Sequence, residues 1–370
     1  MKKFTYREKD YTFRRYPETT NKSLQAWNAG DEYVLAKLEE LDVSDKCIAI
    51  YNDRFGFLST ILDDNHPIPV VDRKSQLKSI EQNMELNGLT WDSEQSISPL
   101  DQLPKTVDIG IITIPKTMDL FKLYLQHVSQ ALADDGIVIC SFMTKYFSPQ
   151  MLSIAGEFFE EVDQSLAKKK SRILTLKEKK EKTPDPIIEE IPFSFSEDHQ
   201  EHLKQYPGVF SGGHIDYATQ FLIMHLEISK ENEMVLDLAS GNGVIARAIQ
   251  IKNPTAEIHL TDDSRLAIAS SKLNLSSENT HFHWNDTLDE LEKSSFDLVV
   301  SNPPFHFGHE TNIEVSVKLF QEVAEVLKPD GRFICVANQH LNYKTHLDKI
   351  FKTVEVIAQT DKFILYKSME

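Results

Sequence analysis

The stretch Met234-Val235-Leu236-Asp237-Leu238-Ala239-Ser240-Gly241-Asn242-Gly243 decides the fold of the second half of the chain. Its apolar beginning predicts a short buried strand, and its two glycines lead into the helical pattern of Val244–Ile251. Glycines in such a turn let the backbone approach a ligand without a Cβ in the way, and the following helix offers free N–H groups. The stretch therefore predicts a binding crevice at the carboxyl end of a strand.

Strands and helices alternate along the rest of this half. The predicted strands after the glycine turn are Glu257–Thr261, Phe296–Val300 and Arg332–Ala337, and the predicted helices between them are Arg265–Leu275 and Val315–Leu327. Alternation of this kind predicts a parallel sheet with helices on both faces.

The first half of the chain repeats the same plan. Its predicted strands, in the same order and at similar spacing, are Lys46–Tyr51, Pro69–Asp72, Val107–Ile111 and Ile137–Ile139. The length of 370 residues also exceeds what a single core usually supports. We therefore predict an α/β protein built from two tandem Rossmann-like domains.

The two predicted copies differ where a ligand would bind. The first copy has Asn52-Asp53-Arg54-Phe55-Gly56, with one glycine, at its first turn, and Ile114-Pro115-Lys116 where the second copy has Asn302-Pro303-Pro304-Phe305. We therefore predict that the first domain is degenerate. The expected boundaries are 1–177 for the degenerate domain, 178–192 for a charged, proline-containing linker, and 193–370 for the active domain.

The glycine turn also carries a nucleotide-binding pattern. Gly241-x-Gly243-x-x-Ala246 matches the dinucleotide fingerprint, and Asp262 lies 19 residues beyond Gly243 at the end of the next predicted strand. A carboxylate at that place can accept hydrogen bonds from ribose hydroxyls. The pattern predicts an adenosine-type cofactor and leaves NAD and S-adenosylmethionine open, beside the alternative of a tight turn without a ligand.

A second motif, Asn302-Pro303-Pro304-Phe305, follows the strand beside this crevice. The two prolines stiffen the backbone and remove two N–H donors, which leaves acceptors: the Asn302 amide oxygen and the Pro303 carbonyl. Such a pair suits a planar amino group, and Phe305 offers a face on which its ring can stack. We predict that these four residues are catalytic and that they position an amine for methylation.

Together, these motifs resemble the class I methyltransferases that modify an exocyclic nitrogen. Asn302-Pro303-Pro304-Phe305-His306 in a tandem fold is similar to the bacterial ribosomal RNA guanine-N2 methyltransferases, which pair a degenerate methyltransferase-like domain with an active one. Four further segments resemble the branch that acts on large-subunit RNA: Leu24–Tyr33, Asn52–Gly56, Val209–Ser211 and Val336–Leu341.

The resemblance implies two class I methyltransferase domains and methylation of N2 of a guanine in 23S ribosomal RNA with S-adenosyl-L-methionine. It implies that His306 neighbours the substrate and that Asp286 faces the cofactor adenine. The cofactor-binding residues implied in this way are Asp237, Ala239, Gly241, Gly243, Asp262, Asp286 and Asn302. Ala239 and Ser240 stand where the family usually has Gly-Cys.

Several alternatives stay open at this point. A 16S ribosomal RNA guanine, adenine N6 in nucleic acid, or a protein glutamine amide are other targets for the same amine chemistry. A ribosome assembly protein that binds RNA without catalysis is the alternative outside the enzymes. A dehydrogenase is a further reading of the glycine turn, although the Asn-Pro-Pro-Phe motif has no role in hydride transfer.

The net charge of −17 argues against non-specific nucleic-acid binding. One segment, Leu166–Lys182, is strongly basic, with eight basic residues and two acids. It is either a solvated strand edge or a phosphate-binding patch. On the second interpretation the first domain recognises RNA through Lys168, Lys169, Lys170 and Arg172.

No metal site is expected, because the histidines that invite one (His281, His283, His306 and His309) are predicted to lie on separate loops without ligand spacing. The three cysteines form no CxxC pair, and no apolar run is long enough to span a bilayer. We expect a cytoplasmic monomer that binds ribosomal RNA, of the large rather than the small subunit, and neither membrane nor metal.

Overall fold

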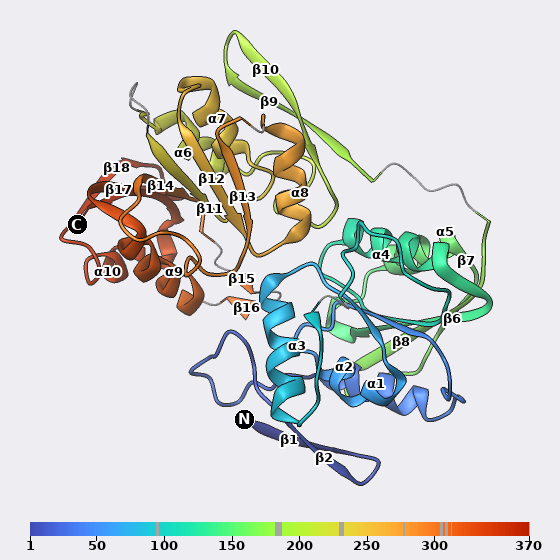
Figure 1. The fold of residues 1–370 in the computed structure, drawn as a ribbon. Helices are drawn as coiled ribbons and strands as arrows, with labels where there is room; N and C mark the ends of the chain where they lie inside the picture. Colours follow the sequence, from blue (N-terminus) through green and yellow to red (C-terminus); the bar gives the residue numbers. More distant parts are fainter. Residues whose placement is uncertain are drawn as a thin grey trace. The chain divides into compact units, whose positions relative to one another are not determined.

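The computed structural model describes residues 1–93, 96–181, 187–228, 233–276, 278–303, 306–307, 310–311 and 313–369 (Figure 1). The chain divides into two compact units, Met1–Pro186 and Ile187–Glu370. This division falls within the segment 178–192. Strand β8 (Ser171–Lys179) ends inside this segment, and strand β9 (Glu189–Ser196) begins inside it.

The second unit contains a seven-stranded sheet in the order β13-β12-β11-β14-β17-β19-β18. Its first five strands are parallel: β13 (Thr280–Trp284), β12 (Glu257–Asp262), β11 (Met234–Leu238), β14 (Phe296–Ser301) and β17 (Leu327–Asn338). Strand β19 (Phe363–Met369) runs antiparallel to its neighbours β17 and β18 (Thr353–Gln359). The glycine turn after β11 therefore lies at the centre of the parallel part.

Helices cover both faces of this sheet (Figure 1). On one face, α6 (Tyr217–His225) and α7 (Val244–Lys252) contribute to a core that includes Val235 and Ile258, and α8 (Arg265–Asn274) packs beside α7. On the other face lie α9 (Ile313–Val326) and α10 (Tyr343–Leu347), in a core that includes Leu236. Val235 and Leu236 face opposite cores because successive strand residues point to opposite sides of a sheet.

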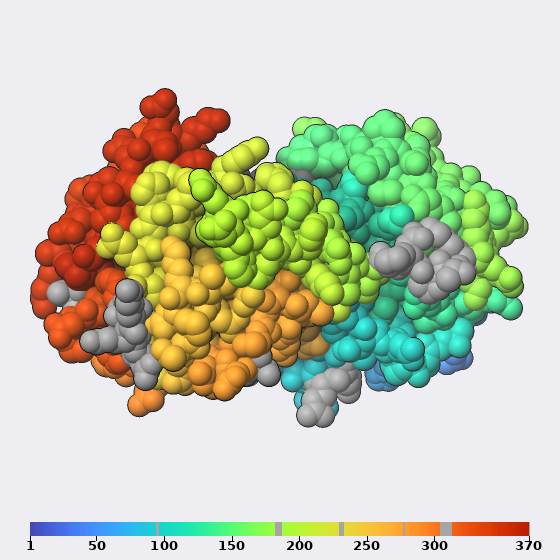
Figure 2. Space-filling model, turned by 90° about the horizontal axis from the view of Figure 1, so that it is seen from above, coloured from blue at the N-terminus to red at the C-terminus, as the bar shows by residue number. Residues whose placement is uncertain are grey.

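A hairpin that the sequence analysis did not predict opens this unit. Strand β9 pairs with β10 (His199–Gln205), and β10 packs against α8. The Glu201 carboxylate forms an ion pair with the Arg247 guanidinium at 2.5 Å, which ties the hairpin to α7. Figure 2 shows the segment 187–215 lying against the segment 245–275 on the visible face of this unit. Two short strands, β15 (His306–Phe307) and β16 (Glu310–Thr311), form a separate pair.

The first unit repeats the strand order of the second. Its sheet has the order β4-β3-β5-β6-β8-β7. The strands are β4 (Ile68–Val70), β3 (Ile48–Tyr51), β5 (Val107–Thr113), β6 (Leu132–Met143), β8 and β7 (Phe159–Gln164). A single parallel bridge between Val70 and Ile97 occupies the place of β13. The predicted duplication is confirmed, because both sheets place a late antiparallel strand beside the last parallel one: β19 beside β17 in the second unit and β8 beside β6 in the first.

The remaining elements of the first unit surround this sheet. They are the hairpin β1 (Lys2–Tyr6) and β2 (Lys9–Phe13), the helices α1 (Ala29–Leu38), α2 (Phe57–Ile61), α3 (Lys74–Leu86), α4 (Met118–Ala131) and α5 (Pro149–Phe158), and the 3₁₀ turns η1 (Asp63–Asn65) and η3 (Thr144–Tyr146). A third 3₁₀ turn, η4 (Gln339–Leu341), belongs to the second unit. Within the part of the chain that the structure describes, no helix has both the length and the apolar character of a membrane span.

Candidate active site

The carboxyl ends of β11, β12 and β14 meet at one edge of the second sheet. Leu238, the last residue of β11, is paired with Thr261 on one side and with Ser301 on the other. The residues that follow these partners are Asp262 and Asn302. Parallel pairing therefore brings two of the predicted site residues to the two sides of the glycine turn, although 40 positions separate them in the sequence.

Asp237, on strand β11, stabilises the turn through a hydrogen bond to the helix that follows it. Its side chain is buried, and its Oδ2 accepts a hydrogen bond of 3.0 Å from the backbone N–H of Ala246 in the first turn of α7. Its Oδ1 is buried and has no hydrogen-bond partner among the residues that the structure describes. Burial raises the pKa of Asp237 to about 7. Asp237 thus fixes the start of α7 and keeps one acceptor available beneath the crevice.

The two glycines of the turn have different physical roles. Both have a left-handed backbone, with φ of 55° at Gly241 and 79° at Gly243. A Cβ on Gly243 would lie 3.0 Å from the Ser271 Oγ and the Leu275 Cδ1, so Gly243 is needed for the packing of α7 against α8. A Cβ on Gly241 would meet nothing within 4 Å. Gly241 therefore borders open space, as a backbone that contacts a ligand must.

Ala239 shares this left-handed conformation with a φ of 59°. A residue with a Cβ in that region costs roughly 1–2 kcal/mol relative to glycine, which accounts for the glycine that is usual at this position in the resembling family. The conformation is retained because the neighbouring Ser240 N–H donates to the Thr261 carbonyl at 3.1 Å and holds the turn on β12.

Asp262 is half-buried and organises the rim of the crevice. Its Oδ2 accepts from the N–H of Gly241 and its Oδ1 accepts from the N–H of Ser264, each at 2.9 Å. The Asp262 carbonyl accepts a hydrogen bond of 3.1 Å from the N–H of Asn285, which places Asp286 next to it after the end of β13. The structure therefore brings Asp262 and Asp286 to the same edge of the sheet.

The Asn302 side chain has a defined orientation. Its amide nitrogen donates to the Asp216 Oδ2 at 3.1 Å and to the Thr219 Oγ1 at 2.9 Å. Because the Asp216 carboxylate only accepts, the nitrogen of the amide must face it, and the Asn302 Oδ1 faces the other way. Asp216 is the N-cap of α6, and its side chain is held in place because it accepts hydrogen bonds from the N–H groups of Ala218 and Thr219.

The sequence analysis missed Asp216 and Thr219. An aspartate before a helical pattern is a recognisable N-cap, so the local signal for Asp216 was present. Its contact with Asn302, 86 positions away, was not predictable from that signal. Pro303 is buried, whereas Pro304 and Phe305 lie outside the described residues. The backbone of His306 is paired with Thr311, and its side chain lies outside the description.

The equivalent turn of the first unit has a glycine where helix packing requires one, but it has no glycine where the second unit borders open space. Asn52 and Gly56 have left-handed φ values of 57° and 71°, as the second unit has at Ala239 and Gly243. A Cβ on Gly56 would lie 2.7 Å from the Ile80 Cα, so this glycine also serves helix packing. At the position of Gly241, which borders open space in the second unit, the first unit has Arg54.

The predicted basic patch lies on the hairpin between β7 and β8. Lys168 and Ser171 are joined by two backbone hydrogen bonds of 2.9 Å, and the intervening Lys169 and Lys170 have positive φ values of 48° and 63°. Such a two-residue turn favours Asn-Gly, so two lysines there are conformationally strained. The structure brings the three lysines to one exposed turn and places Arg172 in the adjoining strand.

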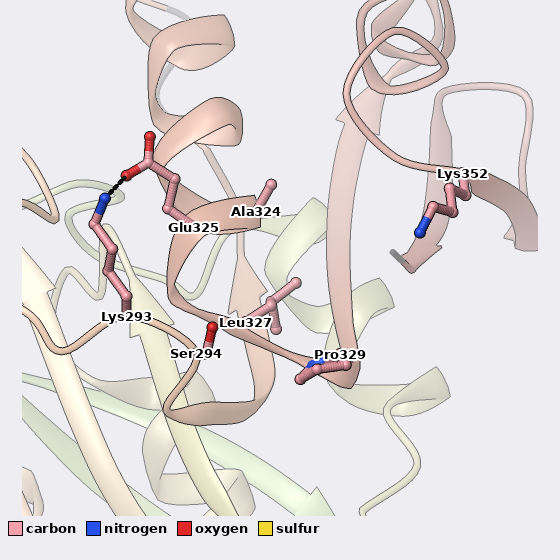
Figure 3. Close-up of a pocket in the computed structure, with 7 residues that line it drawn as sticks. All are labelled: Lys293, Ser294, Ala324, Glu325, Leu327, Pro329 and Lys352. Atoms are coloured by element: carbon pink, nitrogen blue, oxygen red, sulfur yellow. Dashed lines mark ion pairs between the residues drawn. The ribbon is translucent and has the colours of Figure 1, made fainter.

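One depression of about 330 Å³ lies elsewhere on the second unit (Figure 3). Its lining residues are Lys293, Ser294, Ala324, Glu325, Leu327, Pro329 and Lys352, and Lys293 forms an ion pair with Glu325 at 3.0 Å. These residues precede β14 and β18 or lie around the start of β17. The depression is therefore at the amino ends of the strands, away from the crevice described above.

The fold and the crevice define a class I methyltransferase domain that follows a degenerate copy of itself. Family comparison agrees with this division: residues 1–181 match the RLMG N-terminal domain, and residues 200–367 match the methyltransferase small domain. Ribosomal RNA large subunit methyltransferase G of Shewanella putrefaciens is 30% identical over 367 residues, with 96% of each chain covered. The corresponding protein of Shewanella oneidensis is 32% identical over 370 residues, again with 96% of each chain covered.

This chain therefore belongs to the ribosomal RNA large subunit methyltransferase G family. A solved 16S rRNA N2 methyltransferase of T. thermophilus, in complex with AdoMet and guanosine, has a TM-score of 0.80. It is 17% identical, with 100% of this chain and 98% of that chain covered, and at this identity the likeness is one of fold. The family and the fold class predicted from the sequence are confirmed.

Proposed function

We propose that this chain transfers a methyl group from S-adenosyl-L-methionine to the exocyclic N2 amine of a guanine in 23S ribosomal RNA. The observation that carries the proposal is the fixed orientation of the Asn302 amide, which presents an acceptor oxygen beside the glycine turn. The names of the family members, which refer to large-subunit ribosomal RNA, support the substrate class. The guanosine bound in the solved structure of similar fold supports the choice of base.

The crevice fits a nucleoside cofactor with a positively charged sulfur. The open space at Gly241 admits a ligand against the backbone. The buried Asp237 Oδ1, which accepts no hydrogen bond from the described residues, could accept one from the ligand. Asp262 would accept from the ribose hydroxyls and Asp286 from the adenine amine, while Ala239 lines the turn. When bound, S-adenosyl-L-methionine supplies a methyl group that its sulfonium has already activated.

The chain's own contribution to the reaction is to hold the amine. The Asn302 Oδ1 and the Pro303 carbonyl would each accept one hydrogen of the guanine N2 amine, which turns the nitrogen lone pair toward the methyl carbon. Methyl transfer would form one nitrogen–carbon bond and break the sulfur–carbon bond of the bound cofactor, and the amine would release one proton to water. Positioning supplies most of the rate, so neither a base nor a metal is required for this step.

The target base must leave its stack to reach Asn302, which costs a few kcal/mol. Phe305, by its place in the motif, and His306 would contact the base or its phosphate. Tyr217 follows Asp216 directly and is 67% exposed, so it offers a second aromatic face next to the residue that orients Asn302. Exposed aromatic side chains at the entrance would offset part of the cost of unstacking.

The function is tested by mapping methyl transfer onto purified ribosomal RNA from cells that lack the protein. We expect radioactive methyl groups at N2 of a single guanine in 23S RNA and none in 16S RNA. Methylation of adenine N6, of 16S RNA or of a protein amide would contradict the proposal. Binding of RNA without methyl transfer or cofactor binding would favour an assembly protein.

We also propose that the first unit contributes RNA recognition and binds no cofactor. Arg54 stands where Gly241 borders open space in the second unit, and Ile50 stands where Asp237 offers its acceptor. A cationic guanidinium in that place would repel a sulfonium. The strained turn at Lys169 and Lys170 instead carries exposed basic side chains on an acidic protein, although the Lys169 ammonium is paired with the Glu32 carboxylate at 2.6 Å, and strain of this kind is retained more often at functional sites.

Replacing Lys168, Lys169, Lys170 and Arg172 together by serine is therefore expected to weaken RNA binding by at least about tenfold and to flatten its dependence on salt. Cofactor affinity should not change. A filter-binding titration over a range of salt concentrations measures both effects. The matched control replaces four other exposed lysines of the same unit by serine: Lys3, Lys9, Lys22 and Lys105. Equal RNA affinity and salt slope in the two variants would reduce the patch to a solvated strand edge.

We further propose that the protein acts as a monomer in the cytoplasm. Cys47, Cys140 and Cys335 are free thiols in the structure, and Cys140 and Cys335 are buried. Unpaired cysteines of this kind are typical of a reducing compartment.

A further inference from the structure

Three histidines of the second unit gather on the edge of its sheet, outside the crevice. His259 lies on β12, and His281 and His283 lie on β13, with His259 directly opposite His281 in the register. The expectation that His281 and His283 lie on separate loops is wrong, because parallel pairing of these two strands places them beside His259. Glu257, two residues before His259 on β12, shares the same face of the sheet.

The distances in this cluster match those of a metal site. The Glu257 Oε1 lies 3.1 Å from the His281 Nε2 and 3.7 Å from the His259 Nε2. All three atoms lie within 4.8 Å of one another. A tetrahedral ion with bonds of about 2.0–2.1 Å separates its ligand atoms by about 3.3–3.4 Å. The three side chains therefore need only small rotations to meet one ion.

The outer contact of His259 also fits metal binding. Its Nδ1 lies 3.0 Å from the His283 Nε2, which leaves Nε2 as the nitrogen that faces Glu257. The His259 side chain is 16% exposed, and its Nε2 has no hydrogen-bond partner among the described residues. Metal-binding histidines almost always donate the other ring N–H to a neighbouring acceptor, which here is His283.

We propose that Glu257, His259 and His281 form a site for a divalent transition metal ion, with Zn²⁺ as the best match and water as the fourth ligand. Imidazole nitrogens and one carboxylate are ordinary Zn²⁺ ligands. The ion joins the edge strand β13 to β12, and both strands lead into the rim that holds Asp262 and Asp286. The site is structural and separate from methyl transfer, so it does not depend on the function proposed above.

The test uses the full-length chain without a polyhistidine tag, stripped with a chelator and dialysed. Zn²⁺ alone is titrated in competition with a chromophoric chelator, and Co²⁺ is added in parallel to record the visible absorption of a tetrahedral site. His281→Gln is the main variant, because this side chain is 48% exposed and its loss spares the core. Glu257→Gln is the second variant, and His202→Gln, an exposed histidine on strand β10, is the matched control.

We expect the wild type and His202→Gln to bind one Zn²⁺ per chain and to show the Co²⁺ absorption. His281→Gln should lower the affinity by more than about 100-fold and abolish the absorption, and Glu257→Gln should lower the affinity by about tenfold or more. Wild type that binds no ion in the micromolar range overturns the proposal. So does a His281→Gln variant that binds as tightly as the control.

Discussion

Replacing Asn302 by alanine is expected to lower the single-turnover rate of methyl transfer by about 10³-fold, with little change in cofactor affinity. Loss of one preorganised polar contact to a reacting group commonly costs 10²–10³-fold in rate. Under the proposed function the Asn302 Oδ1 would be such a contact, because Asp216 and Thr219 hold the amide nitrogen and leave the oxygen to accept from the substrate amine. An effect on the rate without an effect on binding is typical of an interaction made mainly in the transition state.

The variant Asp216→Asn separates positioning from chemistry. It keeps the size of the side chain and an oxygen that can cap α6, but it no longer requires the Asn302 nitrogen to face it. We expect a rate loss of at most about 100-fold, with the melting temperature nearly unchanged. Rapid-quench assays with saturating cofactor measure the rate, and calorimetric titration measures cofactor affinity. Near-normal turnover of Asn302→Ala would refute the proposed role of the amide.

Replacing Asp262 by alanine is expected to weaken S-adenosyl-L-methionine binding by about 100-fold, or about 2.7 kcal/mol. This is the size expected when a charged acceptor of ribose hydroxyls is lost. Calorimetric titration of the purified chain with the cofactor measures the change directly. Equal affinities of the wild type and the variant would remove Asp262 from the cofactor site.

The structure adds a cost in stability to this second prediction. The Asp262 carboxylate also supports the turn itself, because it accepts from the N–H groups of Gly241 and Ser264. Asp262→Ala should therefore also lower the free energy of unfolding by about 1–3 kcal/mol. Asp262→Asn is the control, because it keeps one acceptor oxygen for the turn. It should recover part of the stability and less of the cofactor affinity, as measured by chemical denaturation and calorimetry.

The sequence by itself determined the fold class and the location of the crevice. Strand and helix periods are local properties, so the pattern around Met234–Gly243 was sufficient to predict β11, the turn and α7. The same argument, applied twice, predicted the duplication. It missed the hairpin β9–β10, because short, partly exposed strands with many charged residues carry a weak apolar pattern.

The chemistry that can be predicted from a motif is also local. Gly241 and Asn302 were identified from their neighbours in the chain, and the resemblance to a family assigned them roles. The two reasons for glycine, open space at Gly241 and helix packing at Gly243, became distinguishable only when the atoms around each position were known.

Only the tertiary structure decided how the Asn302 amide is turned and which histidines lie together. Asp216 and Asn302 are 86 positions apart, and His259 and His283 are 24 positions apart. Contacts over such separations depend on strand register and on where a helix begins against the sheet, and a shift of one residue would reverse which face each side chain occupies. Because register is set by the packing of the whole domain, no local pattern around these residues could have predicted them.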